Sequence, residues 1–69
     1  MTSPKEEMAD LIQRLRQQID ALTQEQADAL KRATYLGMTP DEAKVYDARR
    51  IKITELMGQL VEIRQAQAG

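Results

Sequence analysis

The stretch that decides the fold is Leu36-Gly37-Met38-Thr39-Pro40-Asp41-Glu42. Gly37 suits the left-handed position just past the end of a helix, because glycine has no Cβ to clash there. Thr39 is a favoured N-cap residue, Pro40 fits the first helical position, and Glu42 stands where a capping box places its carboxylate. One helix is therefore expected to end before Gly37 and a second to begin after Thr39.

Similar signals mark the start of the first helix, where Ser3 is the expected N-cap, Pro4 the first helical residue and Glu6 the reciprocal capping carboxylate. Residues 4–36 then repeat apolar positions at the spacing of one helical face, which we call the seam. In heptad notation its d positions are Met8, Leu15, Leu22, Ala29 and Leu36, and its a positions are Ile12, Ile19, Gln26 and Ala33. Because Gln26 is the single polar residue of this seam, we expect it to set the register.

The first helix has one alternative, a break near Leu22-Thr23. The stretch Leu22-Thr23-Gln24-Glu25-Gln26-Ala27 has the pattern of a capping box and parallels the sequence that follows Gly37. A break there would give a three-helix bundle. No Gly or Pro enforces it, so an uninterrupted first helix is favoured.

The second helix is expected over about residues 40–66, followed by a frayed tail at residues 67–69. Its apolar face is formed by Tyr46, Ile53, Leu56, Met57, Leu60 and Ile63, with Val45 and Val61 at its edges. Arg49 lies within this face. We expect its methylenes to cover apolar neighbours while the guanidinium reaches solvent or a carboxylate; a partner-specific ion pair is the alternative.

The two helices predict an all-α, antiparallel, coiled-coil-like hairpin. An antiparallel turn about Gly37 sets residue i opposite roughly residue 75 − i. In that register the acidic residues Asp20, Glu25 and Asp28 lie beside the basic residues Arg49, Arg50 and Lys52. Opposite charges therefore meet along the hairpin, and they disfavour other registers.

Composition excludes most chemistry. The chain has no His, Cys, Phe or Trp, so imidazole catalysis, thiolate chemistry, disulfides and zinc sites of the usual kinds are ruled out. Ten basic against eleven acidic residues give a net charge of −1, which provides no general attraction to nucleic acid. We expect no enzyme activity, no metal and no cofactor.

The 69 residues predict one small helical domain over residues 1–69. Apolar residues never run long enough to span a bilayer, and the N-terminus has no signal peptide pattern. A soluble, cytoplasmic protein without a membrane partner is therefore expected.

The apolar faces are broader than one hairpin can cover, which predicts self-association into a helical bundle, most simply as a homodimer, or docking on a helical partner protein. The interface is expected to use Met8, Ile12, Leu15, Ile19, Leu22, Leu30, Tyr46, Ile53, Leu56, Met57, Leu60 and Ile63. Arg49, Arg50 and Lys52 are the candidate charged contacts to a partner. The expected function is a non-enzymatic oligomerisation or adaptor module.

The alternative function is a nucleic-acid-binding helix-turn-helix regulator built from about residues 33–52. Ala33, Gly37 and the apolar residues after it have the spacing of that motif, and three cations follow. Asp41 and Glu42, however, would put negative charge in the first turn of the recognition helix, where phosphate approaches. No aromatic residues for base stacking accompany the cations. Protein binding is therefore favoured.

Overall fold

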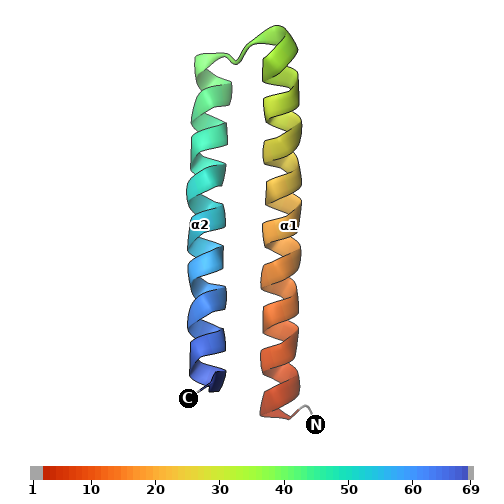
Figure 1. The fold of residues 1–69 in the computed structure, drawn as a ribbon, viewed down its shortest axis with the longest axis vertical. Coiled ribbons are helices and arrows are strands. Elements are labelled where there is room, and N and C mark those ends of the chain that lie inside the picture. Colours follow the sequence, from red (N-terminus) through yellow and green to blue (C-terminus); the bar gives the residue numbers. More distant parts are fainter. Residues whose placement is uncertain (1–2, 69) are drawn as a thin grey trace.

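The computed structural model describes residues 3–68 and consists of two helices, α1 (Pro4–Leu36) and α2 (Pro40–Ala68). They lie side by side and antiparallel, joined by a turn at residues 37–39 (Figure 1). The predicted two-helix hairpin is thus confirmed. α1 is continuous through Leu22-Thr23, so the three-helix alternative is wrong.

The end of the chain differs from expectation at its last turn. α2 continues to Ala68, two residues beyond its expected end. Gly69, the last residue of the expected frayed tail, lies outside the described residues. Within residues 3–68, neither helix combines the length and the apolar character needed to cross a membrane.

Both helices begin at the predicted caps. The Glu6 amide donates to Ser3 Oγ at 3.2 Å, and the Glu42 amide donates to Thr39 Oγ1 at 3.1 Å. Each bond satisfies one of the amides that a helix start leaves without a partner. The capping box at Thr39 differs from the standard one, in which the carboxylate accepts from the backbone amide of the N-cap residue. Here the Glu42 carboxylate accepts a hydrogen bond from the Thr39 hydroxyl, at 3.1 Å. Thr39 therefore uses its hydroxyl as both donor and acceptor.

Gly37 ends α1 with φ 78° and ψ 177°. Its amide donates to the Ala33 carbonyl at 2.9 Å, which completes the last helical turn. Positive φ was expected, but ψ is extended rather than left-handed helical, a combination that is essentially restricted to glycine. The extended ψ directs the chain away from the end of α1 and toward the start of α2.

The apolar core lies in the half of the hairpin away from the turn. Leu15, Ile19 and Leu56 are the buried hydrophobic residues of the described chain. Packed against them and partly buried are Leu22, Ile53, Leu60 and Ile63. We call this region the apolar half, and the region from Gln26 to Arg49, which includes the turn, the turn-proximal half.

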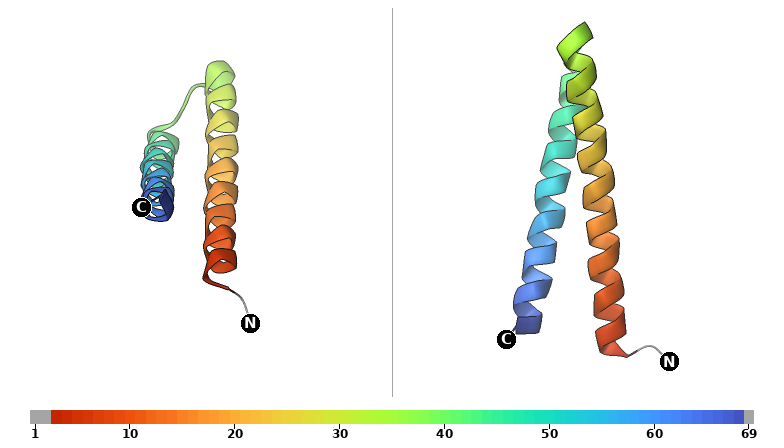
Figure 2. Two further views of the ribbon diagram at one scale, coloured as in Figure 1. Left: turned by 60° about the horizontal axis from the view of Figure 1, so that its bottom comes forward. Right: turned by 45° about the vertical axis from the view of Figure 1, so that its right-hand side comes forward.

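The hairpin is long and thin, with extents of 50 × 20 × 16 Å. Its radius of gyration is 15.8 Å, whereas a compact domain of this length has about 11 Å. The turned views in Figure 2 show that the helix axes are inclined to each other, as side chains packing between two helices require. Two helices alone thus leave most side chains at the surface.

Candidate protein-binding site

The hairpin itself covers most of the predicted interface. Among the predicted residues, Leu15, Ile19 and Leu56 are buried, and the half-buried ones are Met8, Ile12, Leu22, Tyr46, Ile53, Leu60 and Ile63. The remaining two, Leu30 and Met57, are 50% and 49% exposed. These two remain accessible to another chain.

Other apolar residues add to the exposed surface. Leu11, Val45 and Val61 each expose about half of their area, while Ile51 projects from the outer face of α2. Leu36 was placed in the seam but is 84% exposed. Because α1 ends beside the turn and α2 begins only at Pro40, no turn of α2 lies opposite Leu36. Its neighbour Tyr35, which sequence analysis did not single out, is equally exposed.

A polar layer crosses the contact between the helices where the turn-proximal half begins. From here on, the seam means the facing positions of both helices, those of α1 named above and Tyr46, Arg49, Ile53, Leu56, Leu60 and Ile63 of α2. Gln26 is buried, its Nε2 donates to the Tyr46 carbonyl at 2.9 Å, and its Oε1 accepts from Arg49 Nη1 at 2.9 Å. Both ends of the amide are therefore satisfied, as burial of a polar group requires. The contact between residues 26 and 49 agrees with the register expected for the hairpin.

Arg49 also binds Glu25, with 3.0 Å between its Nε and the carboxylate Oε2. The Arg49 side chain is 21% exposed and that of Glu25 is 57% exposed. The methylenes of Arg49 thus lie in the seam while its guanidinium is held by two residues of α1. The register read from the sequence places Glu25 and Arg49 side by side, whereas the joint hydrogen bond to Gln26 is visible only in the structure.

The other two cations behave differently from expectation. Arg50 binds Asp47 of its own helix, at 2.9 Å between Nη2 and Oδ1, and not an acidic residue of α1. One residue after Arg49, its side chain is turned about 100° around the helix and leaves on the other edge. Lys52 forms no ion pair with any residue between Ser3 and Ala68. Asp28 accepts instead from Gln24 Nε2, at 3.2 Å.

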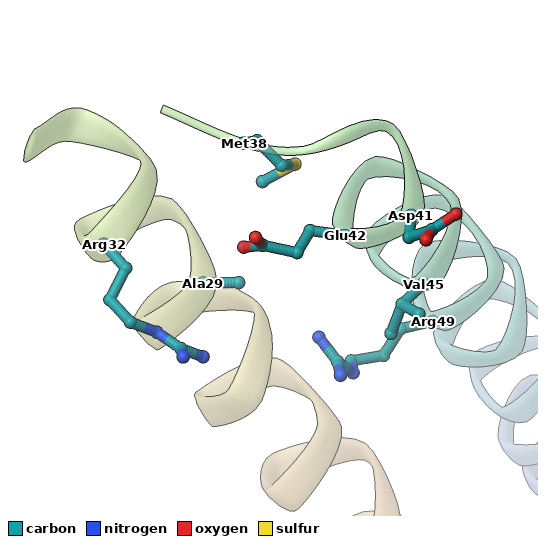
Figure 3. Close-up of a pocket in the computed structure, with 7 residues that line it drawn as sticks. All are labelled: Ala29, Arg32, Met38, Asp41, Glu42, Val45 and Arg49. Atoms are coloured by element: carbon teal, nitrogen blue, oxygen red, sulfur yellow. The ribbon is translucent and has the colours of Figure 1, made fainter. Parts of the chain in front are cut away.

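A cavity of about 220 Å³ lies between the helices next to the turn (Figure 3). It is lined by Ala29, Arg32, Met38, Asp41, Glu42, Val45 and Arg49. The cavity exists because Ala29 occupies a seam position that Leu15 and Leu22 fill with larger side chains. Apolar walls and charged groups of both signs suit it to a protein side chain.

Metal binding has no comparable support. In the part of the chain that the structure describes, no three potential metal-ligating side chains come together. The exposed apolar residues and the cavity are therefore the features from which a function can be argued.

No family model, curated protein or solved structure matches the chain.

Proposed function

We propose that this chain is a non-enzymatic protein–protein interaction module that associates with itself through helix packing, as an oligomerisation or adaptor domain. The observation that carries the proposal is its exposed area. The hairpin exposes 5677 Å². A compact monomer of 7.8 kDa exposes about 4,400 Å². The excess of about 1,300 Å² exceeds the area of about 800 Å² that one partner buries in a typical stable interface.

The chemical character of the excess area supports the same proposal. Five large apolar residues flank the seam with 44–54% of their area exposed: Leu11, Leu30, Val45, Met57 and Val61. Among the residues that the structure describes, three apolar side chains are buried, which is a small core against the conformational entropy lost by ordering two long helices. Pairing two hairpins into a four-helix bundle covers those flanking residues that lie on the docked side, and a twofold dimer closes the assembly.

The helix-turn-helix alternative has less support. Its two helices cross at about 90–120°, whereas α1 and α2 are antiparallel over their length (Figure 1). Arg49, a cation that would contact phosphate, is held by Gln26 and Glu25. Asp41 and Glu42 lie exposed in the first turn of α2.

Sedimentation equilibrium over a wide range of chain concentration tests the proposal. We expect a mass that rises to at least twice 7.8 kDa. A fully helical chain that remains at 7.8 kDa throughout would contradict self-association. Titration with duplex DNA at several salt concentrations tests the alternative, because binding that weakens steeply with salt is the signature of phosphate contacts.

A further inference from the structure

The hairpin has two sides, and they differ in the exposed residues that a second copy of the chain could contact. Successive residues of a helix turn by about 100°, so residues just before and just after a seam residue lie on opposite sides of the seam. Leu11, Arg32 and Val45 each precede a half-buried seam residue. Arg32 and Val45 also line the cavity, so we call this the cavity side.

The opposite side carries residues that follow a seam residue. They include Arg16, Leu30, Arg50, Met57 and Val61, after Leu15, Ala29, Arg49, Leu56 and Leu60 respectively. Leu11 and Leu30 therefore form a matched pair: both belong to α1, and they are 44% and 50% exposed, but they lie on different sides.

The cavity side has an exposed apolar side chain at one end and, at the other end, a cavity that can accommodate such a side chain. Leu11 borders a shallow hollow near the start of α1, together with Glu7. Ala29 and Val45 line the cavity near the turn. The midpoint between residues 11 and 29 is residue 20, which is also the middle of α1 (Pro4–Leu36).

We propose that a second copy of the chain docks antiparallel on the cavity side, so that Leu11 of each copy enters the cavity of the other. This inference rests on the proposed self-association and names its surface. A twofold axis beside residue 20 fills both cavities at once and leaves no open end, as a closed dimer requires. The two hairpins then overlap along their whole length of 50 Å.

Charge complementarity supports this arrangement. Glu7 lies about one turn before Leu11, and Arg32 lies about one turn after Ala29. Antiparallel docking therefore brings Glu7 of one copy opposite Arg32 of the other. Neither residue forms an ion pair with another residue in the range 3–68, so both are available.

The opposite side is disfavoured by the same geometry. With an axis at residue 20, Arg16 of one copy lies at the level of residue 24 of the other. In the hairpin register this is the level of residue 51, next to Arg50. Docking through that side about this axis would bring Arg16 toward an Arg50 that is already paired with Asp47 of its own helix. The like charges give that side no counterpart of the Glu7–Arg32 contact.

The dimensions of the cavity side are also large enough for a typical stable interface. The broad face of the hairpin measures 50 by 20 Å. This is about 1,000 Å², which is enough for the roughly 800 Å² that one partner buries in a typical stable interface. A second copy is therefore the occupant that the length, the charges and the area of this side favour.

The first test compares the two matched leucines by sedimentation equilibrium. We expect Leu11→Gln to raise the dissociation constant about tenfold or more, since it removes a central apolar contact. Leu30→Gln, the control, should change it less than about threefold. Circular dichroism of each variant verifies that the helices remain folded.

The second test exchanges charges between the copies. Glu7→Arg and Arg32→Glu should each weaken the dimer, and the double variant should recover most of the loss. The two residues are 25 positions apart on one straight helix, about 38 Å, so recovery requires contact between different copies.

The outcomes separate this inference from the proposed function. A monomeric wild type would overturn both. A wild-type dimer that Leu30→Gln weakens and Leu11→Gln does not, without recovery in the double charge variant, would overturn the docking surface and leave self-association standing.

Discussion

The two halves of the hairpin are packed by different means. In the apolar half, Leu15, Ile19 and Leu56 exclude water and depend on contact area. In the turn-proximal half, the seam holds Gln26 and Arg49 in hydrogen bonds, and beyond them the small Ala29 leaves a cavity. Stability is therefore expected to reside mainly in the apolar half, and choice of register mainly in the other.

This division follows from the physics of the two contacts. Apolar side chains that repeat every three or four residues retain much of their contact when one helix slides along the other. A buried amide or guanidinium does not, because a lost partner costs about 1–3 kcal/mol for each group left unsatisfied. One polar layer can thus exclude registers that the apolar half alone would tolerate.

The largest effect is expected in the apolar half. Leu56 is only 4% exposed, so Leu56→Ala should lower the free energy of unfolding by about 2–5 kcal/mol. Leu36→Ala, at a residue 84% exposed, is the control and should cost less than about 0.5 kcal/mol. Urea unfolding at one fixed chain concentration measures both. Equal losses would contradict the placement of Leu56 in the core.

The polar layer should respond to single and double substitution in opposite ways. Gln26→Leu removes the acceptor of Arg49 and the donor to the Tyr46 carbonyl, so we expect a loss of about 1–3 kcal/mol. Adding Arg49→Leu should recover most of it, because an apolar layer replaces a buried polar one. The double variant should then populate more than one register, seen as extra amide signals in NMR spectra. A double variant as unstable as Gln26→Leu, with a single set of signals, would count against this role.

Replacing each of the two described glycines by alanine should change the free energy of unfolding in opposite directions. Gly37 has φ 78°, so Gly37→Ala is expected to destabilise by about 1–3 kcal/mol through the backbone alone, since no atom lies within 4 Å of the added Cβ. Gly58 lies inside α2 with equally open surroundings, and Gly58→Ala should stabilise by about 0.5–1 kcal/mol. Thermal unfolding of both variants measures the signs. A Gly37→Ala variant as stable as wild type would show that the positive φ at residue 37 imposes no cost on a side chain.

The smallest effect belongs to the ion pair at the rim of the polar layer. Glu25 is 57% exposed, so Glu25→Gln should cost only about 0.2–1 kcal/mol at low salt. Salt screens such pairs, and the difference from wild type should shrink at about 1 M NaCl. A larger loss that is insensitive to salt would mean that Glu25 supports Arg49 as an integral part of the buried layer.

Sequence patterns predicted the turn, the caps at Ser3 and Thr39, and the opposition of residues 26 and 49. These features depend on local chemistry and on helical periodicity, both of which a sequence displays directly. Leu36 shows the limit of such predictions. Periodicity assigns a residue to a face of its helix, but it does not tell where the facing helix begins.

The site was less accessible to prediction for a related reason. Arg49 and Arg50 are adjacent in sequence, yet one binds across the hairpin and the other within α2. Their difference depends on the inclination of the helices and on which edge each side chain leaves. The cavity likewise requires both helices, because Ala29 of α1 creates the space and Val45 of α2 forms its wall.

The start of α1 and the end of α2 lie together at one end of the hairpin (Figure 1), where Pro4 and Gln67 line the same hollow. A segment joined to either terminus would therefore emerge at that end. In the proposed antiparallel pair the two such ends point in opposite directions, about 50 Å apart. Anything joined to the two copies would therefore leave the pair at ends separated by the length of the hairpin.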